Sequence, residues 1–552
     1  MNLENLGNLF TFIGGLGLFL YGMNTMADGL QKSASGKMKS LLGYLTNNRF
    51  LGVVFGAVIT AIIQSSSATT VMVVGFVNAG ILTLVQAVGV IMGANIGTTI
   101  TAWIVSMNEW GSALKPEFFA PLLVGIGVVA FMFFNKQKVK EVGQILVGFG
   151  VLFIGLSFMS GAIEPYKDAP IFSEAFRILG QNPFFGILAG LVVTAIIQSS
   201  SASVGILQTL AINGVVNWRS AIFITLGQNI GTCVTALLSS VGAQKNAKRA
   251  AVIHLLFNVF GAAIFGIIMY VIFAVNQKLA MSTISTVEIS IFHTVFNITN
   301  TLLLFPFAKL LVRLSERIVS DKHPDDEEID EVAEVCRALD DRILENPGFA
   351  IETANREVVV MGNVAIKTAR MAMQGLLEKD TKAIEYVFRK EEVINELEKV
   401  LTEYLVKVDN LSLSEEQHDK IKNLLYTVSD IERVGDHCEN IVELAKKRVE
   451  MNLHFSDVGY EDLKQIISEV MISLEGCIEA RESMDFNTVR KVGRSEDEVD
   501  NLEDDLRDKH IIRLSQGKCD TESGLLFLDV ISNLERISDH AYNIAGYVQS
   551  EL

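Results

Sequence analysis

Nine long apolar runs alternate with short polar segments over the first 315 residues of the chain. Each is close to the length of about 20 residues that a helix needs to cross the hydrocarbon core of a bilayer. They cover residues 9–30, 51–77, 82–105, 119–134, 142–163, 185–210, 221–238, 250–275 and 289–312. Two of these runs, 51–77 and 185–210, carry polar residues at their centres. The pattern predicts an all-α, polytopic membrane domain in which these two runs form broken or re-entrant helices.

Beyond residue 320 the apolar residues recur at the spacing of amphipathic helices instead. We expect a polar, acidic linker over residues 321–345, followed by a soluble helical domain over residues 346–552. Helices are predicted there over residues 351–377, 383–408, 415–449, 461–484, 489–514 and 523–548. Residues 431–437 match residues 534–540 at an offset of 103. This repeat predicts two three-helix bundles in tandem.

The apolar half is also an internal repeat. Residues 60–68 and 194–202 both read TAIIQSSSA, and Asn-Ile-Gly-Thr follows each copy at 95–98 and 229–232. The glycines of an earlier run repeat as well, at positions 15, 17 and 22 and again at 148, 150 and 155. Repeat one is therefore expected over residues 9–134, repeat two over residues 142–275, and an extra helix over residues 289–312.

The charges of corresponding loops predict that the two repeats are inverted, because loops rich in Lys and Arg stay in the cytoplasm. The loop after the first run carries Lys32, Lys37, Lys39 and Arg49. Its counterpart carries Glu164, Lys167, Asp168, Glu174 and Arg177, without a basic excess. The same rule places the acidic half in the cytoplasm. The first run has no basic region before it and no cleavage pattern, so we expect it to be a membrane helix rather than a removed signal.

Overall composition agrees with a chain that meets two solvents. Half of the residues are hydrophobic, and the net charge of −17 is divided into +8 before residue 316 and −25 after it. No basic face suggests nucleic-acid binding. The five cysteines are scattered and lack CxxC spacing, which favours a reducing compartment for the acidic half over a disulfide framework.

The polar clusters inside the two broken runs are the candidate binding site, because polar side chains in a membrane are costly unless they pair or line a wet cavity. The candidates are Gln64, Ser65, Ser66, Ser67, Thr69, Gln198, Ser199, Ser200, Ser201 and Ser203. Consecutive serines disfavour an unbroken helix. Amides at a half-helix N-terminus suit an anion, while carbonyls and hydroxyls suit Na⁺. The alternative is that these small residues only let helices pack closely, but an inverted duplication favours one site built from two halves.

Weaker candidates lie in the Asn-Ile-Gly-Thr copies, where Asn95, Thr98, Asn229 and Thr232 place amides and hydroxyls beside a glycine. They could form an ion site or a second layer of the binding site. His254 and His293 are interpreted as core residues rather than proton relays. No Asp, Glu, Lys or Arg lies in the middle of the apolar runs, so coupling to a metal cation is favoured over coupling to protons. A cation and an anion bound together would each raise the affinity for the other.

The doubled QSSS motifs, their downstream NIGT copies and the inverted duplication resemble the type II sodium–phosphate cotransporter family, in its compact bacterial form. The resemblance covers nearly all of residues 1–315. It implies symport of inorganic phosphate with Na⁺ across the cytoplasmic membrane, with Gln64–Ser67 and Gln198–Ser201 at the phosphate and sodium sites.

The acidic half resembles PhoU, a cytoplasmic regulator of phosphate uptake whose two three-helix repeats carry an E/D-xxx-D signature. The signature falls here at Glu432 and Asp436, and at Glu535 and Asp539. The resemblance implies that these carboxylates could hold a divalent or transition metal. The alternative is that Arg433 and Arg536 simply neutralise them.

We therefore expect a sodium-driven phosphate symporter with a regulatory domain, embedded in membrane lipid, with a homodimer as a further expectation. Two alternatives remain open: a membrane phosphate sensor without net transport, and a carrier of another oxyanion. No nucleophile–base pair, P-loop or cofactor fingerprint suggests an enzyme.

Overall fold

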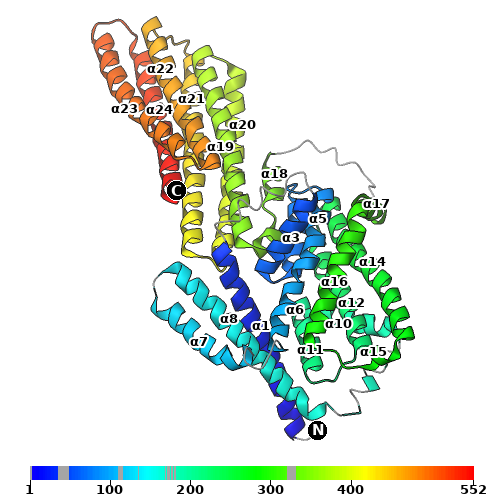
Figure 1. The fold of residues 1–552 in the computed structure, drawn as a ribbon. Coiled ribbons are helices and arrows are strands. Elements are labelled where there is room, and N and C mark those ends of the chain that lie inside the picture. Colours follow the sequence, from blue (N-terminus) through cyan, green and yellow to red (C-terminus); the bar gives the residue numbers. More distant parts are fainter. Residues whose placement is uncertain are drawn as a thin grey trace. The chain divides into compact units, whose positions relative to one another are not determined.

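The computed structural model describes residues 3–34, 49–109, 116–134, 136–167, 169–170, 174–175, 178–179, 182–319 and 331–552. These residues are helical almost throughout, which confirms the all-α prediction (Figure 1). They form two compact units. The first contains the described residues before 320 together with residues 340–349, and the second contains residues 331–339 and 350–552.

The first unit, called the membrane unit below, has seven helical segments that are long and apolar enough to cross a membrane within the described residues. They are α1 (Leu3–Ala34), α5 with α6 (Leu84–Gly97, Thr99–Ser106), α7 (Pro116–Phe133), α8 (Gln137–Ile163), α12 with α13 (Trp218–Gly231, Cys233–Ser239), α14 (Lys245–Val275) and α16 with α17 (Thr286–Leu304, Ala308–Ile318). Four shorter apolar helices remain: α3 (Arg49–Ile63), α4 (Ser66–Asn78), α10 (Pro183–Ile197) and α11 (Ser200–Ile212).

The first two short helices form a re-entrant hairpin. At 1.5 Å per residue, α3 and α4 are each about 20 Å long, less than the hydrocarbon thickness of about 30 Å. Helix α3 runs parallel to α5, because Gly89 lies against Arg49 near the start of both helices and Gly97 lies against Ala57 near their ends. The chain must therefore return along α4 before α5 begins. The apolar run at 51–77 is thus a hairpin rather than a spanning helix.

The second repeat builds the same hairpin from α10 and α11. Gly190 of α10 lies against Ile224 of α12, and Gly231 of α12 lies against Leu191 and Thr194. This contact again requires two parallel helices, with α11 returning between them. The close approach needs glycine, because a β-carbon at Gly227 would lie 1.9 Å from the carbonyl oxygen of Ile187.

Helices α1 and α8, which lie side by side in Figure 1, show how the repeats are related. Gly15 of α1 packs on Gly155 of α8, and Gly22 packs on Gly148. In the sequence repeat, Gly15 corresponds to Gly148 and Gly22 to Gly155, so the two contacts exchange partners. Such a reciprocal contact between antiparallel helices is the geometry of a two-fold axis. It confirms the inverted arrangement of the repeats.

Two hydrogen bonds mark the opposite ends of the membrane unit. At one end, the Gln244 amide donates to Asn78 Oδ1 at 2.8 Å. At the other, the Thr286 amide donates to Glu109 Oε2 at 3.0 Å. We call these the Asn78 end and the Glu109 end.

The second unit, called the helical unit below, confirms the six predicted helices to within a few residues. They are α19 (Pro347–Glu378), α20 (Thr381–Asp409), α21 (Glu415–Glu450), α22 (Asp457–Ser483), α23 (Phe486–Ser515) and α24 (Thr521–Glu551) (Figure 1). Helices α20 and α21 pack together, α22–α24 pack into a set of three, and α21 packs on α24. Helix α19 joins the first set through contacts of Gly375 with Ile384 of α20 and of Leu376 with Arg448 of α21. Ser414 and Gln417 form the capping box that starts α21.

Part of the predicted linker is structured. Residues 321–330 lie outside the described residues, but Glu331–Ala338 form helix α18 and Asp341–Glu345 form the short 3-10 helix η5. Helix α18 buries Val335 and Ala338 and pairs Glu331 with Lys390 at 2.5 Å. Because the segment is acidic, the sequence pattern predicted a solvated linker and did not predict the burial of these apolar residues.

Candidate functional site

The tips of the two hairpins meet at equivalent residues of the repeats. Ser66 and Ser200, which are 134 positions apart, share a hydrogen bond of 3.3 Å between their Oγ atoms. Both side chains are buried. Each is the first residue of its returning helix, α4 or α11. The structure thus brings the two QSSS motifs together, as the duplication predicted.

The motif itself breaks each helix. Gln64 and Gln198 adopt left-handed backbone conformations, with φ of 55° and 54°. Such conformations are uncommon for residues other than glycine and cluster at functional sites. Ser65 and Ser199 then cap the returning helices by accepting hydrogen bonds from the amides of Ala68 and Ala202, at 3.1 and 3.2 Å. The glutamine ends the first helix, and the serine starts the second.

A hydroxyl–hydroxyl hydrogen bond joins the two arms of each hairpin. Thr60 Oγ1 donates to Thr69 Oγ1 at 3.0 Å, and Thr194 Oγ1 donates to Ser203 Oγ at 2.8 Å. Gln228 Nε2 adds a hydrogen bond to Ser203 Oγ at 2.9 Å. Thr60 and Thr194 were not among the predicted site residues, although they are the first letters of the repeated nonapeptide.

A cluster of oxygen atoms lies beside the Ser66–Ser200 contact. Thr101 Oγ1 donates to Gln64 Oε1 at 3.0 Å, and Ser201 Oγ lies 3.4 Å from Gln64 O and 3.5 Å from Thr101 Oγ1. All three side chains are buried. Neutral carbonyl and hydroxyl oxygens of this kind are the ligands that hard cations prefer. Thr101, which comes from α6, was not among the predicted site residues.

The two halves of the site differ in exposure. Gln64 is only 4% exposed, whereas the equivalent Gln198 is exposed. The hairpin tips of the two repeats are therefore not equivalent in this conformation. An inverted-repeat carrier is expected to show such an inequality, because it opens to one side at a time.

The first turns of α4 and α11 favour an anion. The amides of Ser66, Ser67, Ser200 and Ser201 have no acceptor within their own helices, and the N-terminal ends of both helix dipoles meet at the Ser66–Ser200 contact. With hydroxyl donors beside them, these amides can bind an oxyanion without Lys or Arg.

The other predicted polar residues make hydrogen bonds within their own repeat. Asn95 donates to Ile91 O at 2.8 Å within α5, and Thr232 donates to Asn229 O at 2.7 Å. Thr98 is the buried residue at which α5 ends and α6 begins. None of these hydrogen bonds reaches Ser66 or Ser200. Their closeness to the hairpin tips remains a prediction for Asn95 and Thr98.

Asn229, a predicted site residue, contacts two polar side chains of α16. Its Oδ1 lies 3.3 Å from His293 Nε2 and accepts from Asn297 Nδ2 at 3.4 Å. Asn258 and Cys233 lie in the same buried region and share a hydrogen bond of 3.4 Å. A signal was present, because residues 254–258 and 293–297 both read His-x-x-Phe-Asn.

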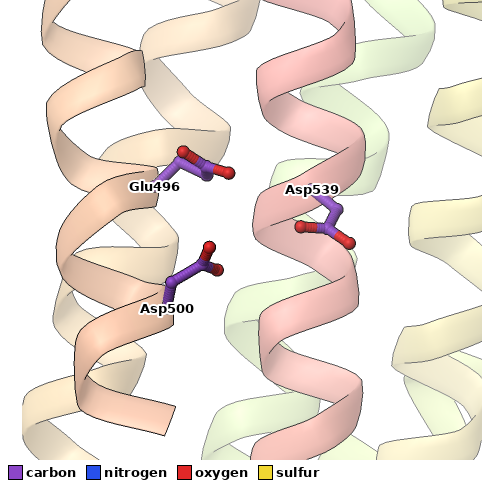
Figure 2. Close-up of side chains that lie close together, drawn as sticks. All are labelled: Glu496, Asp500 and Asp539. Carbon is purple, nitrogen blue, oxygen red and sulfur yellow. The ribbon is translucent and has the colours of Figure 1, made fainter. Parts of the chain in front are cut away.

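A second candidate site lies in the helical unit. Figure 2 shows Glu496 and Asp500 on α23 facing Asp539 on α24, and carboxylate oxygens of the three lie within 4.8 Å of one another. Asp539 was predicted, whereas Glu496 and Asp500 were missed. A signal for them exists in the related stretches 389–398 (RKEEVINELE) and 494–503 (RSEDEVDNLE).

The other predicted carboxylates, Glu432 and Glu535, have raised pKa values. Burial first, and then the nearby Asp436 carboxylate, raise the pKa of Glu432. Burial and then Asp539 raise the pKa of Glu535 in the same way. Arg433 lies 3.6 Å from Asp436, and Arg536 lies 3.8 Å from Asp539, so part of the charge is neutralised within the helix. Among the described residues, the three carboxylates close enough to share one cation are Glu496, Asp500 and Asp539, and oxygen donors of this kind are those that hard divalent cations prefer.

Comparisons with known families cover both units. A family model described as Na+/Pi-cotransporter matches residues 18–161 and 170–293. A model described as PhoU domain matches residues 358–445 and 463–548.

Individual relatives point the same way. The chain is 24% identical to the "Putative inorganic phosphate export protein YjbB" of Salmonella typhimurium, over 89% of this chain and 88% of that protein. It is 31% identical to "Uncharacterized protein YqeW" of Bacillus subtilis, over 48% of this chain and 83% of that protein. It is 43% identical to the human "Sodium-dependent phosphate transport protein 2B" over 13% of this chain and 10% of that protein.

Proposed function

Because the chain belongs to the Na+/Pi-cotransporter family and carries a PhoU domain, we propose that it couples the movement of inorganic phosphate to sodium ions across a membrane. The observation that carries this proposal is the contact between Ser66 and Ser200, where two half-helix N-termini meet beside a cluster of neutral oxygens. One side of this arrangement suits an oxyanion, and the other suits Na⁺.

Phosphate would bind to the free amides and hydroxyls at the starts of α4 and α11. Sodium would bind to oxygens of Gln64, Thr101 and Ser201. Since no lysine or arginine is among these residues, the cation supplies the positive charge that holds phosphate in a poorly solvated site. Each ion then raises the affinity for the other, and this mutual effect is the coupling. Asn95, Thr98, Asn229 and Thr232 would form a second layer around this site or a further ion site.

Loop charge sets the proposed orientation. The basic residues Lys245, Lys248 and Arg249 near the Asn78 end favour a cytoplasmic position for this end and an outer position for the Glu109 end. Residues 1–320 would then be the transport domain in the cytoplasmic membrane, and residues 346–552 a cytoplasmic regulatory domain, with the segment 321–345 between them. This division assigns no enzymatic step to either part.

Phosphate uptake into proteoliposomes tests sodium coupling. With an inward Na⁺ gradient we expect accumulation of labelled phosphate above equilibrium, and with K⁺ in place of Na⁺ only equilibration or no uptake. Every net positive charge that enters with phosphate would add about 2.3 kcal/mol per 100 mV of membrane potential. Equal uptake with and without the Na⁺ gradient would contradict the coupling.

A second candidate function is phosphate export, which the name of the relatives similar over 89% of this chain favours. Proteoliposomes loaded with phosphate distinguish the two directions: efflux driven by an outward Na⁺ gradient alone supports a reversible symporter, whereas efflux independent of Na⁺ supports an exporter. Phosphate binding without flux in either direction would indicate a sensor. Competition by sulfate or arsenate tests whether the carrier takes another oxyanion.

We also propose that the Glu496–Asp500–Asp539 cluster binds a divalent cation. Mn²⁺ at about 100 times its dissociation constant should stabilise the folded full-length protein by about 2.7 kcal/mol, measured as a rise in the thermal unfolding temperature. Replacing Glu496→Gln together with Asp539→Asn should remove this rise. The matched control is Asp504→Asn, an exposed carboxylate on the same helix. A rise that survives in the double variant would exclude the cluster as the site.

A further inference from the structure

A short segment of the chain is folded into the membrane unit although the chain on both sides belongs to the helical unit. Residues 340–349 contact the membrane unit, whereas residues 331–339 and 350–552 form the helical unit. The segment contains η5 and the first turn of α19. We call it the 340–349 segment.

Polar contacts tie this segment to both repeats at the Asn78 end. Asp340 Oδ2 accepts from Asn78 Nδ2 at 2.7 Å, at the end of α4 in repeat one. Arg342 pairs with Asp340 at 2.7 Å and donates from Nε to Ser239 O at 2.6 Å, at the end of α13 in repeat two. The Arg342–Asp340 pair therefore bridges helices of opposite repeats.

Apolar side chains anchor the same segment. Ile343 and Phe349 are fully buried. The Phe349 ring packs edge-on against Phe76 of α4, with centroids 5.4 Å apart, and lies 6.0 Å from Phe55 of α3. Gly75 of α4 lets the segment approach, since a β-carbon there would lie 3.0 Å from Arg342 Cβ. The segment therefore contacts both helices of the first hairpin, α3 and α4.

Helix α4 links this contact to the binding site. Its first residue, Ser66, meets Ser200, and its last residue, Asn78, holds Asp340. A rigid helix of 13 residues cannot change its contact at one end without moving the other. Helix α4 packs on α13, and the 340–349 segment contacts the ends of both, through Asn78 and Ser239. A path to the Asn78 end that opened between these two helices would have to break those contacts.

The chain also links the segment to the helical unit. Helix α19 is continuous from Pro347 to Glu378, so Phe349 lies on a helix whose remainder is part of the bundle. On the other side, α18 is held to α20 by Glu331 and Lys390. A rearrangement of α18 or α19 must therefore pull on the segment between them.

We propose that residues 340–349 form a strap that holds the Asn78 end of the transporter closed, and that movement of α18 or α19 releases it. The proposal rests on the transport function proposed above, and it adds a restraint by which the helical unit slows transport. A passive anchor would make the same contacts, but its loss would not open the site.

The test compares strap variants in the full-length protein that carries the reporter Val74→Cys, a buried position on α4. A membrane-impermeant maleimide is applied from the cytoplasmic side, and labelling of residue 74 is quantified by peptide mass spectrometry. Arg342→Ala should raise the labelling rate about tenfold, the factor that corresponds to loss of one hydrogen bond to a charged group. Its initial phosphate uptake should rise as well. Asp340→Asn, which keeps the shape of the side chain, should act in the same direction.

Arg317→Ala is the matched control, because Arg317 is an exposed arginine in the last turn of α17, outside the strap. It should leave labelling and uptake unchanged. Unchanged or lower labelling in both Arg342→Ala and Asp340→Asn would overturn the strap. Raised labelling in a protein that shows no phosphate flux would support the strap and contradict the proposed transport, so the two failures are distinguishable.

Discussion

Alanine at Ser66 or at Ser200 is expected to reduce phosphate uptake to background while the protein stays folded. Each serine contributes its hydroxyl to the contact between the two repeats, and each begins a helix whose free amides face the proposed anion site. A hydrogen bond to a charged ligand is worth about 1.5–3 kcal/mol. Loss of one hydroxyl removes this interaction at the point where both halves of the site meet.

Ser106→Ala provides the matched control for these variants. Ser106 is equally buried in a membrane helix, but its hydroxyl donates to Trp103 O within its own helix at 2.9 Å. Uptake by this variant should equal that of the unmodified protein, and all three variants should elute as the same monodisperse species in detergent. Normal uptake by both Ser66→Ala and Ser200→Ala would refute the assignment of the site.

The sequence located the two helix breaks to within the four-residue QSSS motifs, because the signal was local. A run of Gln and Ser inside an apolar stretch has few ways to satisfy its polar groups, and the duplication showed that both copies do the same thing. The same pattern did not identify Thr101 or Gln228. They reach the motifs from α6 and α12, and the sequence contains no information about which face of those helices packs on the hairpins.

Hydropathy alone would count residues 51–77 and 185–210 as spanning helices. Their polar centres predicted broken or re-entrant helices instead, and each run does fold into two half-length helices. The parallel packing of α3 on α5 decides this, and it depends on glycines such as Gly56 and Gly93 that admit a neighbouring backbone. Glycine spacing is visible in the sequence, but its partner is not.

The 340–349 segment was hidden for a different reason. Arg342 binds the carbonyl oxygens of Ser239 and Val241, and backbone acceptors leave no mark in a sequence. Its surroundings are acidic and polar, which is typical of a solvated linker. Only Ile343, Leu344 and Phe349 suggested a buried contact, and three apolar residues are too few to set a period.

Arg481→Met is expected to cost the helical unit about 3–5 kcal/mol of unfolding free energy, the cost of leaving a buried charge without its partner. Arg481 of α22 is fully buried and forms a two-pronged ion pair with Glu551 of α24, at 2.6 and 2.9 Å. Its Nε also donates to Asn355 Oδ1 of α19 at 2.7 Å. One side chain therefore joins the second three-helix set to the first.

Circular dichroism and tryptophan fluorescence separate this effect from damage to the membrane unit. All three tryptophans of the chain precede residue 320, so their fluorescence reports that part alone. Arg481→Met should lose ellipticity at a lower denaturant concentration without shifting the fluorescence transition. Arg370→Ala breaks an exposed pair with Glu475 and should cost only about 0–1 kcal/mol.

A double variant shows whether the buried charge is the cause. If the loss comes from Glu551 left without its partner, Arg481→Met combined with Glu551→Leu should be more stable than Arg481→Met alone, because a buried ion pair can be replaced by apolar side chains at little cost. If the loss comes from packing around the arginine, the second substitution should add to the damage. Recovery in the double variant would assign the role of Arg481 to charge pairing between α22 and α24.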